Sequence, residues 1–312
     1  MINQTTPHVT ATPEPGVVVS AARSAVALWD ALRPRQWIKN LVVLAAPLAA
    51  GELLRPAVAL PALIAVAAFC LASSAGYLVN DVMDAPADRL HPTKMLRPVA
   101  SGRLSPPLAI AGAVALSVAS LLIALTTGQP RLLFVLAVYL AATFSYSLGA
   151  KRVLVIDLAI VASGFVLRAI AGGVATGISL SDWFLLVASF GSLFMVAGKR
   201  YSELRATQER IPDDVPPADG YSLSYLRFVW GMSAGAALFA YAVWAFDPDT
   251  SHANMVWAQI STAPFVLALL RYAVDVDHGR AGTPEEIVLR DRVLQVLGLI
   301  WLASFSLAAG IF

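Results

Sequence analysis

Residues 80–102 read NDVMDAPADRLHPTKMLRPVASG and hold a dense group of charges in a chain that is otherwise largely apolar. Asp81, Asp84 and Asp88 are spaced i, i+3, i+7, so on a helix they share one face, with Asn80 one turn before Asp84. Three carboxylates on one face repel one another unless a cation lies between them. Oxygen ligands of this kind suit Mg²⁺, which proteins bind through one or two carboxylates together with substrate phosphates.

Basic residues follow these acids directly. Lys94, Arg97 and Arg103 lie within reach of the same helix end and offer positive charge to an anion. Acids that suit a metal, next to cations that suit a phosphate, are typical of a site for a phosphorylated molecule. The stretch therefore predicts a magnesium–phosphate site.

The rest of the chain has the composition of a membrane protein. Its 312 residues are 58% hydrophobic and only 13% charged, whereas a soluble domain is about one quarter charged. Apolar segments long enough to span a bilayer, which takes about 20 residues each, recur nine times. We therefore expect an all-α protein with nine transmembrane helices, at residues 38–55, 58–82, 106–126, 131–149, 153–176, 181–198, 223–246, 254–273 and 293–312. The first is the weakest, because Pro47, Gly51 and Glu52 interrupt it.

The N-terminal segment differs from this pattern. It is rich in Thr, Pro, Val and Ala and lacks a basic start followed by a long apolar run, so we expect no cleaved signal peptide. We expect residues 1–25 to form a disordered cytosolic tail and residues 26–312 a single membrane domain. The single cysteine, Cys70, lies in an apolar run, so no intrachain disulfide can form.

Positive charge is unequally divided between the two sides of the membrane. The N-terminal tail and the loops after the second, fourth, sixth and eighth spans, with the adjoining span ends, hold all but three of the 22 Lys and Arg residues, the exceptions being Arg55, Arg131 and Arg168. The positive-inside rule places this side in the cytosol. We therefore expect a plasma-membrane protein whose N-terminus and aspartate-rich site are cytosolic and whose C-terminus is outside. We expect membrane lipids and no nucleic acid among its partners.

Further polar clusters lie on the same side. In RPRQWIKN, Lys39 lies just inside the first span, where an unpaired charge is costly, which favours a functional role. Arg33 and Arg35 could equally contact anionic lipid head groups. FSYSLGAKR, after the fourth span, contributes Tyr146 and Lys151.

Two more clusters follow the sixth and eighth spans. The loop GKRYSELR contains Lys199 and Arg200. The segment EEIVLRDR, before the last span, has the charge pattern of a solvated amphipathic helix, and we favour that interpretation over a site.

Two charges fall inside the fifth span. Asp157 and Arg168 are 11 residues, or three turns, apart and therefore share a helix face. Such charges cost about 2.5–3.5 kcal/mol at mid-membrane and normally face a cavity or a partner. For Arg168 we favour a polar cavity over an interhelical bond, whereas for Asp157 the two interpretations are equally weighted.

The pattern NDxxDxxxDxxHPTKxxRPxAxG resembles the first aspartate-rich motif of the UbiA superfamily of intramembrane prenyltransferases. Typical members carry a second aspartate-rich motif in the loop after the sixth span, and the two acidic clusters hold an isoprenyl diphosphate through Mg²⁺. Here that loop reads GKRYSEL, with one acid next to Lys199 and Arg200. Fixed cations in place of metal ligands indicate a phosphate held directly by Lys or Arg, and hence two phosphorylated substrates.

Five segments, in order, resemble one branch of that superfamily: HPTKxxRP, YSLGAKR, SGFVLRAIAGG, FGSLFMVAGKRYSEL and YLRFVW. The resemblance implies transfer of 5-phosphoribose from phosphoribosyl diphosphate to decaprenyl phosphate, a polyprenyl phosphate. The products would be decaprenylphosphoryl-5-phosphoribose and diphosphate, for actinobacterial cell-wall arabinan synthesis.

Roles follow for the candidate residues. We expect Asp81, Asp84 and Asp88 to be catalytic, with Asn80, Asp84 and Asp88 on the metal and Asp81 on the metal or the ribose hydroxyls. We expect phosphoribosyl diphosphate to contact Lys39, Asp81, Lys94 and Arg97. We expect the polyprenyl phosphate to contact Tyr77, Tyr146, Lys151, Arg168 and Lys199, although Tyr146 suits either substrate and Lys39 and Lys151 could exchange roles.

Two other functions compete with this one. An aromatic or quinone prenyltransferase of the same fold would use an isoprenyl diphosphate and a second acidic pair, which the GKRYSEL loop lacks. A transporter would show charges through both halves of the membrane or broken helices in paired repeats, and neither is clear. Stretches of small residues such as AGAVALSVAS suit packing within one bundle or between subunits, so a homo-oligomer is compatible with the sequence.

Overall fold

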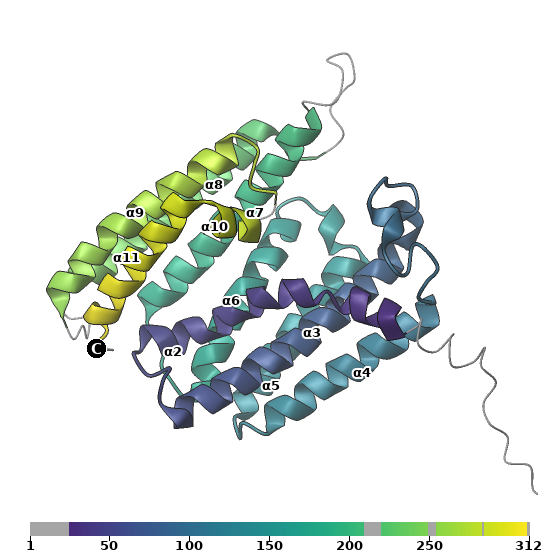
Figure 1. Cartoon of the computed structure of the whole chain (residues 1–312), viewed down its shortest axis with the longest axis horizontal. Coiled ribbons are helices and arrows are strands. Elements are labelled where there is room, and N and C mark those ends of the chain that lie inside the picture. The colour runs from purple at the N-terminus through teal and green to yellow at the C-terminus, as the bar shows by residue number, and fades with distance from the viewer. Residues whose placement is uncertain (1–24, 209–219, 249–253, 283, 311–312) are drawn as a thin grey trace, which may run out of the picture.

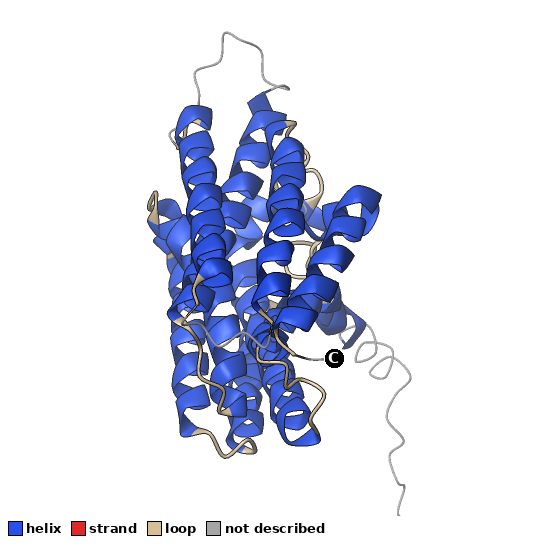
Figure 2. Cartoon of the chain, turned by 90° about the vertical axis from the view of Figure 1, so that its left-hand side faces the viewer, coloured by secondary structure: helices blue, strands red, loops and turns tan. Residues whose placement is uncertain are grey.

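The structure is a computed structural model and describes residues 25–208, 220–248, 254–282 and 284–310. Within these ranges every regular element is a helix, as expected (Figure 2). The expected tail at 1–25 lies outside the described residues except for its last position, which begins a helical segment at 25–32.

The N-terminal helices form one bundle around a shared apolar core. The longest, α3, packs against α4 and α5, and α6 packs against α3, α5 and the 3₁₀ helix η1. Proline stands in the first turn of η1, α3, α4 and α5, where its missing N–H costs no helical hydrogen bond. The elements are η1 (Pro34–Leu44), α2 (Ala45–Ala49), α3 (Pro56–Asp88), η2 (Lys94–Leu96), α4 (Pro106–Leu125), α5 (Pro130–Leu148), η3 (Ala150–Arg152) and α6 (Ile156–Thr176).

The C-terminal helices form a second bundle with its own core, which lies beside the first (Figure 1). Three of them begin at side-chain caps, Ser222, Asn254 and Asp291, whose oxygens accept the first free backbone N–H groups. The bundles are joined through contacts between α6 and α7. The elements are α7 (Asp182–Gln208), α8 (Leu223–Phe246), α9 (Met255–Asp277), α10 (Pro284–Arg290) and α11 (Arg292–Ala308).

Six helices, α3 to α8, are long and apolar enough to cross a membrane, and they match the second to seventh predicted spans. The chain is a multi-pass membrane protein. The predicted count of nine is not confirmed. In the segment predicted as the span 38–55, η1 ends at Leu44 and α2 at Ala49, and Gly51 with φ 71° and Glu52 then turn the chain. Among the described residues, α9 is not one of the apolar spans, and α11 has only 17 residues.

The length of α3 places the aspartates. Its 33 residues extend for about 50 Å at 1.5 Å per residue, whereas the hydrocarbon core of a bilayer is about 30 Å thick. One end of α3 must therefore project from the hydrocarbon, and Asn80 to Asp88 form its polar C-terminal end. The aspartates lie at the membrane surface for this reason.

The start of the chain is fixed against α6 by a close backbone contact. A Cβ atom added at Gly172 of α6 would lie 1.8 Å from the carbonyl oxygen of Val43 in η1. Val43 is fully buried there. Only glycine permits this approach, which holds η1, and with it Lys39, against the first bundle.

Candidate active site

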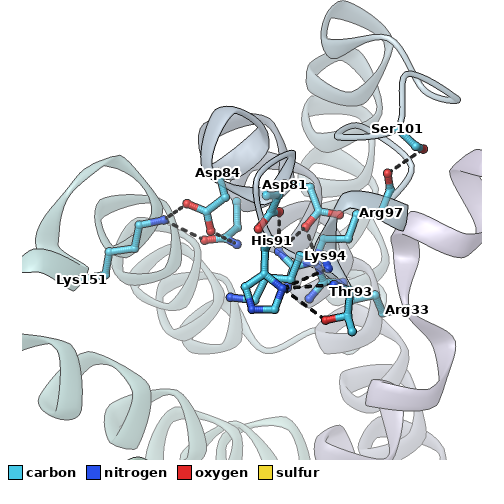
Figure 3. Close-up of polar contacts among 11 residues, drawn as sticks. Arg33, Asp81, Asp84, His91, Thr93, Lys94, Arg97, Ser101 and Lys151 are labelled. Atoms are coloured by element: carbon cyan, nitrogen blue, oxygen red, sulfur yellow. Dashed lines mark hydrogen bonds and ion pairs between the residues drawn. The ribbon is translucent and has the colours of Figure 1, made fainter. Parts of the chain in front are cut away.

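Each aspartate at the end of α3 is paired with a basic side chain, and Figure 3 shows the pairs of Asp81 and Asp84. Asp81 pairs with Arg33, and Arg97 lies between Asp88, at 2.7 Å, and Asp81, at 3.6 Å. Asp81 and Asp88 are buried, with 1% and 3% of their surfaces exposed. The structure thus brings Asp81, Asp88 and Arg97 together as predicted and adds Arg33, for which lipid contact was an equal alternative.

A second group forms around Asp84. The Asn80 amide donates to Asp84 Oδ2 at 2.9 Å, as their one-turn spacing predicts. Lys151, from η3, pairs with Asp84 Oδ1 and donates to the side-chain oxygen Oδ1 of Asn80 at 3.4 Å. Unlike the buried pair Asp81 and Asp88, Asp84 retains 29% of its side-chain exposure. It is therefore the carboxylate that a soluble ligand reaches most easily.

These oxygens fit a hard cation. No three His, Cys, Asp or Glu side chains converge on a single point in the part of the chain that the structure describes. Asp81 Oδ2, however, is buried without a hydrogen-bond partner among those residues, which leaves its lone pairs available. Carboxylate and amide oxygens alone, without sulfur or imidazole, form a donor set that suits Mg²⁺ rather than a softer metal.

The loop after α3 places Lys94 and Arg97 near these acids. The His91 Nδ1 atom accepts the backbone N–H groups of Thr93 and Lys94, both at 3.3 Å, and so shapes the turn that leads into η2. Arg103 bonds Asp30 at 2.9 Å and thereby ties the loop to the helical segment 25–32. Lys94 itself is exposed to solvent, as a residue that meets a soluble anion should be.

A large cavity of about 1340 Å³ lies between the two bundles, and its lining changes along its length. One part of the lining is aromatic and includes Trp183, Trp244, Phe265, Trp301 and Phe305. Another part is polar and includes five of the predicted site residues, namely Lys39, Tyr77, Tyr146, Arg168 and Lys199. A cavity of this kind suits a lipid with an anionic head.

Arg168 combines the two roles that the sequence left in competition. It lines the cavity, but three of its donors are used inside the bundle. They bond Asn40 Oδ1 at 2.7 Å, Tyr139 Oη at 2.8 Å and the Gly164 carbonyl at 2.8 Å. Arg168 therefore holds η1, α5 and α6 together at the cavity wall.

Asp157 pairs with a different helix. Its Oδ2 atom lies 3.3 Å from Arg200, which also donates to Tyr146 Oη at 3.1 Å. Tyr221 donates to Asp157 and accepts the N–H of Val155 at 2.5 Å. Burial and this hydrogen bond to Asp157 raise the pKa of Tyr221 to about 12, so the phenol remains a donor at physiological pH. The network fixes Arg200 at the cavity.

Two lysines lie at the site predicted for the other substrate. Lys39, predicted to contact the soluble substrate, lines the cavity, whereas Lys151, predicted to contact the lipid phosphate, bonds Asp84. Arg200, which the sequence offered with Lys199 as a cation for a phosphate but which was not assigned to either substrate, also lines the cavity. A signal for it existed in Asp157, because an acid inside a span requires a cation as partner.

The chain is similar to known proteins along most of its length. A family model described as the UbiA prenyltransferase family matches residues 41–209. Decaprenyl-phosphate phosphoribosyltransferase of Mycolicibacterium smegmatis is 49% identical over 90% of this chain and 92% of that protein. The protein of the same name from Mycobacterium tuberculosis H37Rv is 50% identical over 89% of this chain and 92% of its own. A UbiA homolog from Archaeoglobus fulgidus, solved with GPP and Mg²⁺, has a TM-score of 0.65 at 16% identity, covering 91% of this chain and 99% of that one, and shares the fold.

Proposed function

The chain belongs to the UbiA prenyltransferase family, and we propose that it transfers 5-phosphoribose from phosphoribosyl diphosphate to decaprenyl phosphate. The observation that carries this proposal is the near 50% identity, over nine tenths of both chains, to relatives named for that transfer. Two separate groups of charged residues support it, since the aspartate end of α3 and the polar part of the cavity suit two different phosphorylated substrates.

The aspartate end of α3 would receive the soluble donor. Asn80, Asp84 and Asp88 would hold Mg²⁺, with Asp81 on the metal or on the ribose hydroxyls. When bound, the cation would neutralise the diphosphate of the donor. Lys94 and Arg97 would hold the diphosphate or the 5-phosphate, and the pairing of Lys151 with Asp84 leads us to add Lys151 to this group.

The cavity would receive the lipid. Tyr77, Tyr146, Arg168 and Lys199 would surround its phosphate, and we assign Lys39 to this group because it lines the same cavity. The aromatic part of the lining would accommodate isoprene units, and the remaining chain would run between helices into the bilayer. Arg200, fixed by Asp157, would supply further positive charge next to Tyr146.

In the reaction, an oxygen of the lipid phosphate would attack C1 of the ribose while the bond from C1 to the diphosphate breaks. We expect inversion at C1, from an α donor to a β product. The lipid phosphate is already ionised near pH 7, so no strong general base is required. Catalysis would rest on positioning the two substrates and on stabilising the charge of the leaving diphosphate.

The charge distribution supports a cytosolic position for this site, with the N-terminus inside and the C-terminus outside. A soluble phosphorylated donor is available on that side of the plasma membrane. Arabinan synthesis of the cell wall would consume the product.

The reaction itself is testable with purified protein. We expect labelled phosphoribosyl diphosphate, polyprenyl phosphate and Mg²⁺ together to give lipid-extractable label, and EDTA to abolish it until Mg²⁺ is restored. Prenylation of an aromatic acid from an isoprenyl diphosphate, without any labelled lipid, would show that the protein is an ordinary prenyltransferase of this fold instead.

The exchanged positions of the two lysines lead to a second prediction. Lys39→Gln should raise the KM for polyprenyl phosphate, and Lys151→Gln the KM for phosphoribosyl diphosphate. Each effect should be about tenfold to a hundredfold, because a hydrogen bond to a charged group contributes about 1.5–3 kcal/mol. Steady-state kinetics with each substrate varied in turn measures both, and each variant is the control for the other. If both variants raised the same KM, the two-region assignment would be wrong.

A further inference from the structure

A second cavity, of about 500 Å³, is lined by residues of α9, α10 and α11 and of the loop after α9. Figure 1 shows where these three helices lie in the second bundle. Its lining differs from that of the large cavity and contains none of the residues assigned above to either substrate. Four arginines and two aspartates provide nearly all of it, which leaves two positive charges in excess. The lining residues are Arg271, Asp275, Arg280, Ile287, Arg290, Asp291 and Arg292.

Both aspartates of this cavity have protein partners. Asp291 caps α11 by accepting the N–H groups of Val293 at 2.8 Å and Leu294 at 3.1 Å, and it accepts Arg271 Nε at 2.6 Å. Burial opposes ionisation of Asp291, but the Leu294 N–H and the Arg271 guanidinium outweigh it and keep its pKa below the usual range. Asp275 lies 4.0 Å from Arg280. Both acids therefore lie next to an arginine, and the lining holds more basic than acidic groups.

Arginine supplies this excess charge. Arg292 has no ion-pair partner among the described residues. Arg280 keeps 70% of its side-chain exposure despite its long contact with Asp275. The planar guanidinium forms paired hydrogen bonds to phosphate oxygens, and Arg is therefore the usual residue for binding a phosphate group. The cavity has the charge and donors for a phosphate.

The surface next to the cavity is apolar. Val293, Val296 and Ile300 of α11 are spaced i, i+3, i+7 on one face and are 54%, 55% and 50% exposed. Apolar side chains so exposed on a membrane protein suit contact with acyl chains. One end of a ligand bound here would contact the arginines, and the rest of it would contact the apolar side chains of α11.

The length of α11 sets the depth of the cavity. Its 17 residues extend for about 25 Å, which is less than the hydrocarbon thickness of about 30 Å. A membrane crossing by α11 would therefore leave Arg292, its first residue, close to the level of the lipid phosphates. Basic pockets between helices on the cytosolic side are where anionic head groups bind.

From charge, donors and depth together, we propose that this cavity binds the phosphate group of an anionic phospholipid of the cytosolic leaflet. The acyl chains of that lipid lie along the apolar face of α11. A soluble phosphate would use the same guanidinium groups but would gain nothing from this apolar face. The binding is independent of the proposed transfer reaction.

The test uses full-length protein in detergent, without substrates. Retention of phosphatidylglycerol and of phosphatidylcholine is measured by native mass spectrometry for the wild type and for the double variant Arg280→Gln, Arg292→Gln. The matched control is Arg55→Gln, Arg131→Gln, which removes two exposed arginines from loops predicted to face the other side of the membrane. Circular dichroism and Tm check the fold of each variant, and single variants replace the double one if it does not fold.

We expect the wild type and the control to prefer phosphatidylglycerol and the cavity variant to bind it at least about tenfold more weakly, since each basic residue near a membrane surface contributes about 1 kcal/mol. Equal retention of the two lipids by the wild type would overturn the proposal, as would an unchanged affinity in a folded variant. Displacement of the lipid by millimolar inorganic phosphate would identify a site for soluble anions instead and would also overturn it.

Discussion

Replacing Asp84 with asparagine is expected to lower turnover about a hundredfold to a thousandfold, which is the range for removing one electrostatic contact from a preorganised site. Asparagine keeps the shape of the side chain but removes the charge proposed to bind the metal. Among the three aspartates, Asp84 is the most exposed, so the change should leave the fold intact. The measurement is the initial rate of label transfer into lipid, at saturating concentrations of both substrates.

The matched control for Asp84 is Glu52→Gln. Glu52 is also partly exposed and also pairs with one cation, Arg55, but it precedes the opposite end of α3. Its substitution should leave the rate unchanged. The double variant Asp84→Asn, Lys151→Gln should lose less rate than the product of the two single losses, because the two residues share one contact. Full activity of Asp84→Asn would remove this residue from the proposed site.

Replacing Gly172 with alanine is expected to destabilise the protein by about 3 kcal/mol, at the upper end of the usual cost of overpacking. The new Cβ would lie 1.8 Å from a backbone oxygen of η1, which cannot move aside as a flexible side chain would. Tm in detergent should fall by roughly 5–10 °C. Because η1 also contains Lys39, the KM for polyprenyl phosphate should rise in protein that remains folded.

Gly231→Ala is the control for this substitution. Gly231 lies within α8, and a Cβ atom there would meet nothing within 4 Å. Alanine favours a helix over glycine by about 1 kcal/mol, so this variant should be as stable as the wild type or slightly more so. If the two alanine variants had the same Tm, the contact of α6 with η1 would not be important for stability.

The general architecture was predictable because it depends on composition and local periodicity. Apolar runs of sufficient length predicted the helices α3 to α8, and the spacing of Asp81, Asp84 and Asp88 placed them together at one helix end. The split of the segment 38–55 was harder to predict. Its Pro47 and Gly51 signalled a weak span, but η1 is also held in place by the Asn40 side-chain amide, which donates to Ser73 and accepts a hydrogen bond from Arg168.

The pairing of charges was not predictable in the same way. Lys39 and Lys151 each lie near the predicted end of a span, and only tertiary packing places one in the cavity and the other against Asp84. Likewise, Arg168 bonds a residue 128 positions away. A single sequence shows that a buried charge requires a partner, but it does not show which helix supplies that partner.

The continuity of α3 has a consequence for where chemistry can occur. Tyr77, which lines the cavity, and Asp84, at the solvent-exposed end, belong to one uninterrupted helix and are seven residues, or about 10 Å, apart along its axis. This continuous helix therefore fixes the distance between the cavity proposed for the lipid and the site proposed for the soluble donor. Reactants from two immiscible phases would therefore meet at a constant depth, and neither would have to dissolve in the solvent of the other.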